Sequence, residues 1–194
     1  MEYIIHRINK IKTLSKLPCK YGVEIDVRSY KSKIILNHEP KMNGDSFIDY
    51  LSNYKHGTLI FNIKEAGIEK EVIDTALNNN IKSFFLLDVE HPFLITSGRI
   101  YKRYLACRYS EYEPIELFIN FKKFTNWLWI DTINKLPITS NKIPILKKFK
   151  TCIVSPERWG RAKDIHVYKK FFNRHNFFPT AIMTDQKCLK IWES

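Results

Sequence analysis

Short runs of β-branched and aromatic residues alternate along the chain with segments whose apolar residues recur at helical spacing. In residues 67–80, for example, Ile68, Val72 and Ile73 fall on one side of a helix. The apolar runs have the length and composition of buried strands. The predicted strands are residues 3–6, 23–27, 59–64, 83–88, 104–108, 127–131, 151–154 and 181–184, and the predicted helices are residues 44–51, 67–80, 114–124 and 162–174.

A strand followed by a helical or loop segment, eight times over, is typical of a parallel α/β protein. The pattern predicts a closed (β/α)₈ TIM barrel in a single domain of residues 1–194. This barrel is compact beside the roughly 250 residues that are usual, so some of its helices must be short or missing. The weakest helical patterns are in residues 10–20, 92–102 and 135–146.

Two further observations bear on the fold. Residues 33–37 form an additional apolar run, which predicts a hairpin with the strand at 23–27 through residues 29–32. The runner-up fold is an open doubly wound sheet. The chain has only six glycines and neither of the glycine-rich phosphate loops that such sheets carry, so the barrel is favoured.

Polar side chains recur where the predicted strands end. Glu24 and Asp26 alternate with Val23, Ile25 and Val27, so both carboxylates point from one face of their strand. Active sites of barrels lie at the carboxyl ends of the strands, where such groups would converge. The polar residues at these ends are His6, Arg7, Glu24, Asp26, Asn62, Lys64, Asp88, Glu90, Arg108, Trp129, Asp131, Ser155, Glu157, Thr184 and Asp185.

Taken singly, these residues have plainer interpretations. His6 is equally compatible with a hydrogen-bonded core histidine, and the acidic pair with a solvated strand face. Arg108 has two interpretations: it binds a phosphate through two hydrogen bonds, or it pairs with Glu111 or Glu113. Trp129 and its neighbour Trp127 are interpreted as one core residue and one pocket residue.

Net charge and composition limit the classes of partner and of protein that fit this chain. The net charge of +12 favours an anionic partner, although a basic solvated surface explains it as well. A nucleic-acid binder is disfavoured because no recognisable binding motif is present. Four cysteines without metal spacing favour reduced thiols in a cytoplasmic protein. No apolar run approaches the ~18 residues of a membrane span, and no signal peptide is expected.

Several of these residues together carry a family resemblance. His6-Arg7, the Glu24-Ile25-Asp26 strand, a hairpin leading to His38, and Asn62-Ile63-Lys64 occur in an order that resembles the glycerophosphodiester phosphodiesterase family. More broadly, the order is similar to that of the phosphatidylinositol phospholipase C-like superfamily. The resemblance covers about the first third of the chain. It implies a (β/α)₈ barrel that cleaves phosphodiesters with two histidines and a divalent cation.

The resemblance also implies roles for individual residues. His6, His38 and Lys64 match catalytic positions, and Arg7 matches the residue that contacts the phosphate. Glu24, Asp26 and Asn62 match the ligands of a cation, expected here to be Mg²⁺ or Ca²⁺. The chain departs from the family twice, because Ile8 stands where a glycine is usual and Asn62 where a third acidic ligand is usual.

The expected function is therefore a metal-dependent phosphodiesterase that acts on a small, lipid-linked or glycan-linked phosphodiester. Its two histidines would act as acid and base on opposite sides of the phosphorus. Arg108 and Trp129 are expected to bind substrate from neighbouring strand ends. The alternative, prompted by Asn62, is a catalytically weakened barrel that binds a phosphorylated ligand without turnover.

Overall fold

The computed structural model, which describes all of residues 1–194, is a mixed α/β fold built on one ten-stranded sheet. Each of the eight predicted strands overlaps an observed strand, so the mixed α/β prediction is confirmed. The strands are β1 (Glu2–Ile5), β2 (Gly22–Tyr30), β3 (Lys33–Leu36), β4 (Asp45–Ser46), β5 (Leu59–Ile63), β6 (Phe84–Leu87), β7 (Ala106–Tyr109), β8 (Trp127–Ile130), β9 (Lys150–Val154) and β10 (Ala181–Thr184).

The parallel strands curve into a nearly closed ring. From β1, parallel neighbours follow as β2, β5 and β6 in one direction and as β10, β9, β8 and β7 in the other. The predicted closure requires a ladder between β6 and β7, but these strands share only an isolated bridge between Leu86 and Leu105. Beyond this bridge, Leu87 and Ala106 line a cavity, so the strand ends do not pair. The sheet is therefore not closed.

The predicted hairpin is present. β2 pairs antiparallel with β3, with Tyr30 opposite Lys33 at the turn. Lys31 and Ser32 form that turn with φ angles of 47° and 59°, in the left-handed region that two-residue hairpin loops require. The short β4 then pairs with β3 and continues the sheet outward.

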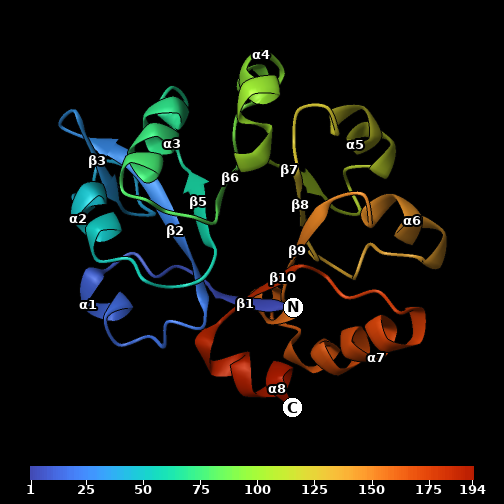
Figure 1. Cartoon of the computed structure of the whole chain (residues 1–194). Coiled ribbons are helices and arrows are strands. Elements are labelled where there is room, and N and C mark those ends of the chain that lie inside the picture. Colours follow the sequence, from blue (N-terminus) through green and yellow to red (C-terminus); the bar gives the residue numbers. More distant parts are fainter.

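The helices lie outside the strands (Figure 1). The segments with the weakest pattern at 10–20 and 135–146 contain helices of only four residues, as predicted. The eight helices are α1 (Ile11–Leu14), α2 (Phe47–Ser52), α3 (Glu69–Asn78), α4 (His91–Tyr101), α5 (Ile115–Phe121), α6 (Ile143–Leu146), α7 (Ile165–His175) and α8 (Leu189–Glu193).

The third weak segment, residues 92–102, was expected to be short or missing and is instead helix α4, eleven residues long. Pro92 lies in the first turn, where its fixed φ favours helix initiation. Gly98 allows the helix to pack against Phe124, since an added Cβ would lie 2.8 Å from the Phe124 Cβ. Gly98 therefore serves a close packing contact.

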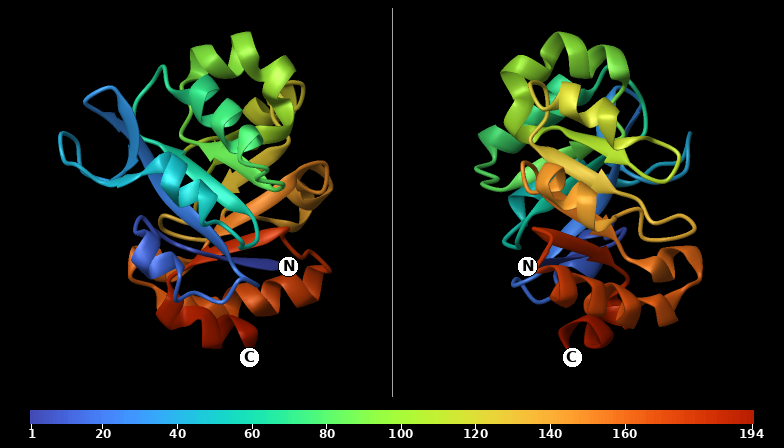
Figure 2. Two further views of the ribbon diagram at one scale, coloured as in Figure 1. Left: turned by 60° about the vertical axis from the view of Figure 1, so that its left-hand side comes forward. Right: turned by 90° about the vertical axis from the view of Figure 1, so that its right-hand side faces the viewer.

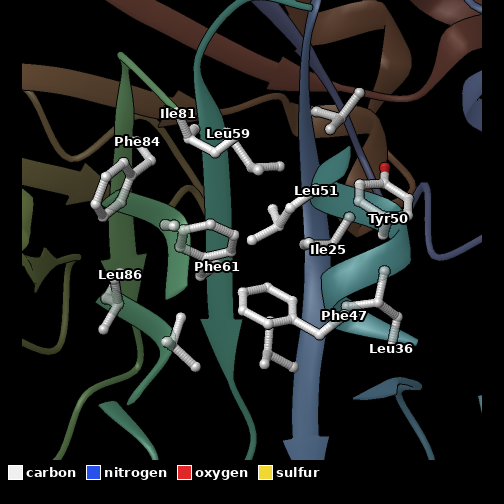
Figure 3. Close-up of a cluster of buried hydrophobic side chains, with 14 of the residues drawn as sticks. Ile25, Leu36, Phe47, Tyr50, Leu51, Leu59, Phe61, Ile81, Phe84 and Leu86 are labelled. Carbon is white, nitrogen blue, oxygen red and sulfur yellow. The ribbon is translucent and has the colours of Figure 1, made fainter. Parts of the chain in front are cut away.

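Three clusters of buried apolar side chains hold the fold together. One packs β2, β5 and β6 against α2, where Phe61 meets Phe47 edge-on at 5.4 Å (Figure 3). A second packs β7 to β10 against α5 and α7. The third cluster takes residues from successive strands, and in it Phe85 stacks on Trp127 at 4.3 Å. This cluster adjoins the polar groups at the strand ends through Trp129.

The two ends of the chain lie close together (Figure 2). The Tyr3 hydroxyl of β1 donates a hydrogen bond to the Trp192 carbonyl oxygen of α8 at 3.0 Å. Cys107 and Cys152 are buried, and all four cysteines are free thiols. None of the helices combines the length and the apolar character needed to cross a membrane.

Candidate active site

A cavity of about 290 Å³, named here the central pocket, lies at the carboxyl ends of the parallel strands. Its wall includes residues that directly follow β1, β6 and β8 in the chain, and residues of the 3₁₀ turn after β9. The structure thus brings together strand ends that are far apart in sequence. Six of the nine predicted site residues line the central pocket: His6, Arg7, Glu24, Asn62, Arg108 and Trp129.

Glu24 and Asp26 share one face of β2 as predicted, and each is 1% exposed. Glu24 Oε2 accepts a hydrogen bond from the Arg7 backbone N–H at 2.8 Å, and its Oε1 accepts one from Asn62 Nδ2 at 2.9 Å. Arg7 has a φ of 55°, in the left-handed region. Non-glycine residues adopt this conformation at some energetic cost, and such residues concentrate at functional sites.

Asp26 lies behind Glu24, outside the lining of the central pocket. Its Oδ2 accepts a hydrogen bond from Asn9 Nδ2 at 2.8 Å and lies 3.4 Å from Arg7 Nε. Its Oδ1 forms an ion pair with Lys64 Nζ at 3.2 Å. Lys64 is thereby held beside the acidic pair, and it does not line the central pocket.

The environment of Glu24 disfavours the ionised form of its carboxyl group. Burial, together with the neighbouring Asp26 carboxylate, raises its pKa from 4.5 to about 7. Hydrogen bonds from Asn62 and Arg7 only partly offset this effect. A cation or an additional proton at Glu24 would therefore be favoured near neutral pH.

The oxygens around Glu24 fit a hard divalent cation. Asp26 and Asn62 are paired residues on adjacent strands. The buried Oδ1 atom of Asn62 has no hydrogen-bond partner, whereas that of Asp26 lies 3.2 Å from Lys64 Nζ. Carboxylate and amide oxygens are the ligand types of Mg²⁺ and Ca²⁺. However, no cluster of three His, Cys, Asp or Glu side chains suitable for a metal is present. The set offers two carboxylates and one amide, which fits a weakly held ion.

His6 follows β1 and its side chain is 13% exposed. Its Nε2 lies 3.8 Å from Glu24 Oε2, and its Nδ1 lies 3.6 Å from Asp185 Oδ1. Burial lowers its pKa from 6.5 to about 4, and the charges of Arg158 and Arg7 act in the same direction. His6 is consequently neutral at pH 7 and has a ring nitrogen free to accept a proton.

Arg158 lines the central pocket but was not identified as a site residue from the sequence. It belongs to a short 3₁₀ turn, Pro156–Trp159, and pairs with Asp185 at 3.1 Å. The backbone N–H of Asp185 donates to Glu157 Oε1 at 3.0 Å, which holds the end of β10 in place. Glu157 and Asp185 carried a signal as polar strand ends, whereas Arg158 follows its strand inside an irregular turn.

Arg108 is held between two carboxylates, those of Asp88 and Asp131. The sequence-based pairing with Glu111 or Glu113 is therefore wrong. Glu113 instead accepts a hydrogen bond from the Ser110 hydroxyl at 2.7 Å. The order of the strands sets these partners. Asp88 and Asp131 follow β6 and β8, the strands on either side of β7, whereas Glu111 and Glu113 lie in the loop after β7.

Trp129 and Trp127 are both buried core residues, and Trp129 also lines the central pocket. The Nε1–H of Trp129 is buried and has no hydrogen-bond partner. A buried donor without a partner is costly, so a ligand acceptor at this position would be stabilising. The expectation that Trp129 borders the site agrees with this position.

His38 does not join His6. It lines a separate cavity of about 280 Å³, named here the rim pocket, together with Arg7, Asn9 and Lys10. Its Nδ1 lies 2.7 Å from Glu39 Oε1. The expected convergence of two imidazoles in one pocket is therefore not formed. The physical reason is that His38 follows β3, which extends outward from β2, whereas His6 ends an inner strand.

These observations define a mixed α/β protein with a polar pocket at the ends of its parallel strands. The whole chain is similar to the solved structure of a phosphodiesterase from Oleispira antarctica in complex with its product sn-glycerol-3-phosphate, with a TM-score of 0.61 and 15% identity. The match covers 100% of this chain and 97% of that chain. At this identity the likeness shows the fold. No protein-family model and no curated protein matches the chain.

Proposed function

We propose that the protein is a metal-dependent phosphodiesterase that cleaves a glycerophosphodiester-like substrate in the central pocket, on a variant of the (β/α)₈ barrel. One observation carries the proposal: a neutral, partly buried His6 lies between Glu24 and Asp185 in a pocket that Arg7 and Arg158 also line. The whole-chain likeness to a phosphodiesterase structure that holds a phosphate ester supports it.

Binding of the phosphate is the first step. Arg7, Arg158 and the free Trp129 Nε1–H offer donors to the anionic oxygens. Arg108 contributes little net charge because Asp88 and Asp131 already neutralise it. The bound phosphate would add negative charge beside His6 and raise its pKa from about 4, which strengthens it as a base.

Proton transfer is the second step. His6 would take the proton from the attacking hydroxyl, and Asp185 would orient the ring and stabilise the imidazolium. His38 lines the separate rim pocket, so we do not assign to it the protonation of the leaving oxygen, which water in the central pocket could supply.

Glu24, Asp26 and Asn62 would hold Mg²⁺ or Ca²⁺, which supplies positive charge to the phosphoryl oxygens in the transition state. Lys64, paired with Asp26, adds a fixed positive charge at the same location. The cation and Lys64 would both stabilise the transition state, because negative charge develops on the phosphate oxygens there.

A phosphodiester panel assayed with Mg²⁺ and with a chelator tests the proposal. His6→Ala should lose about 10²- to 10⁴-fold in turnover, the usual contribution of an acid–base group. His166→Ala is the matched control, because His166 is exposed on α7 and outside the pocket. Full activity in His6→Ala, or no turnover of any diester by the parent, would contradict the assignment.

A second function, binding of a phosphorylated ligand without turnover, is favoured by one observation. Asn62 supplies an amide where a third carboxylate would strengthen the metal site, and protein donors already engage both oxygens of Glu24. Calorimetry distinguishes the two functions. Mg²⁺ binding that is lost in Asp26→Asn supports the enzyme, whereas binding of sn-glycerol-3-phosphate without any metal binding or turnover supports the binder.

A further inference from the structure

A second cavity, named here the side pocket, opens at the unpaired seam between β6 and β7. It measures about 400 Å³ and is lined mainly by apolar side chains of the strand ends and of helices α4 and α5. Leu94, Phe118 and Phe121 contribute to this lining. Leu117 also lines it and is 49% exposed. An apolar cavity beside an exposed leucine is a favourable environment for an apolar ligand group.

The side pocket adjoins the central pocket. Leu87, Asp88 and Arg108 line both cavities. The guanidinium of Arg108 lies between them, fixed by Asp88 on one side and Asp131 on the other. A molecule bound to the arginines and His6 of the central pocket could therefore extend past Arg108 into the side pocket.

The polar groups of the side pocket mostly have protein partners. Asp88 and Arg108 are paired with one another, and Glu113 accepts a hydrogen bond from Ser110. The His91 ring packs edge-on against Phe121 at 5.2 Å. A sugar hydroxyl placed here would gain few free partners, while an alkyl or aryl group would gain buried apolar contact.

We infer that the substrate is a phosphodiester with one apolar alcohol arm, and that this arm occupies the side pocket while the phosphate lies in the central pocket. The inference rests on the proposed function and specifies its substrate class. At about 30 Å³ for each methylene-sized group, the side pocket of about 400 Å³ holds an alkyl arm of about thirteen carbons. Glycan arms are disfavoured by the same lining.

A series of glycerol alkyl phosphodiesters with methyl, butyl, octyl and hexadecyl arms tests the inference. Each buried methylene is worth ~0.8 kcal/mol, so kcat/KM should rise about threefold to fourfold per methylene and level off once the cavity is full. A hexosyl arm should be no better than methyl. A flat series, with the methyl ester still turned over, would overturn the side pocket and leave the proposed function intact.

Two lysine variants of the exposed face of α5 localise the effect. Leu117→Lys places a charge at the side pocket and should flatten the alkyl series. Ile119→Lys is the matched control, because Ile119 is 52% exposed on the same helix and does not line the pocket. Equal chain-length dependence in both variants would contradict the location.

A binding measurement tests the side pocket independently of catalysis. If no diester is turned over, calorimetry with octyl phosphate and methyl phosphate still measures the side pocket. Octyl phosphate should bind at least tenfold more tightly, and Leu117→Lys should remove this preference while Ile119→Lys retains it. Equal affinity for the two phosphates would refute an apolar subsite whatever the outcome of the activity assay.

Discussion

Replacing Glu24 by Gln should stabilise the protein at alkaline pH. The Glu24 side chain is 1% exposed and its pKa lies at about 7 instead of 4.5. The folded state therefore holds this proton more tightly than the unfolded chain does. Stability from this group is complete below pH 4.5 and is lost as the pH rises through 7.

The magnitude follows from the two pKa values. The interval from 4.5 to about 7, at 1.36 kcal/mol per pKa unit, corresponds to about 3 kcal/mol. Glutamine keeps the shape and the hydrogen bond from Arg7 but never ionises. At pH 8 Glu24→Gln should exceed the parent in unfolding free energy by up to about 3 kcal/mol. Near pH 4.5 the two proteins should be nearly equal.

Urea unfolding at pH 4.5, 6 and 8 measures this difference. The pKa of His6, lowered to about 4, acts in the opposite direction, because its contribution is lost as the pH falls from 6.5 to 4. Because His6 Nε2 lies 3.8 Å from Glu24 Oε2, the variant can change this contribution, so the comparison at pH 8, where His6 is neutral in the folded and unfolded states, isolates Glu24. Glu116→Gln, an exposed acid on α5, controls for loss of a surface charge.

A pH-independent difference between Glu24→Gln and the parent would refute the reasoning, as would a variant that is less stable than the parent at pH 8. The same samples report on the cation. Mg²⁺ at ten times its dissociation constant should stabilise the parent by about 1.4 kcal/mol at pH 8. It should stabilise Glu24→Gln much less.

Three further predictions concern other parts of the molecule. Asn62→Glu restores a third acidic ligand and should tighten Mg²⁺ binding at least tenfold by calorimetry; unchanged affinity would remove Asn62 from the site. Gly98→Ala should destabilise by about 1–3 kcal/mol in urea because its Cβ would meet Phe124; a neutral result would show that α4 shifts freely. Asp185→Asn should lower kcat while leaving KM nearly unchanged, and an effect on KM alone would contradict its orienting role.

The alternation of apolar and polar residues predicted most of the architecture. It placed all eight parallel strands and the β2–β3 hairpin, because buried strands must read as apolar runs. The pattern failed at α4, where Gly98 lowers helix propensity and a contact with Phe124 outweighs it. It also could not indicate the missing β6–β7 ladder, since pairing depends on how neighbouring helices pack.

The candidate site was predictable where function follows from strand periodicity. Glu24 and Asp26 had to share a face, and His6 and Arg108 had to lie near strand ends. Arg158 was not predictable, because a 3₁₀ turn has no such periodicity. The position of His38 depends on how far the hairpin extends outward, which a local pattern does not encode.

The central claim is that a phosphate group binds in the central pocket against a neutral His6. Nuclear magnetic resonance titration of the six histidines, with and without sn-glycerol-3-phosphate, tests it most directly. One imidazole, absent from His6→Ala, should titrate with a pKa of about 4 and shift upward when the ligand binds. A His6 that titrates near 6.5, or one whose pKa is unmoved by a ligand that does bind, would contradict the claim.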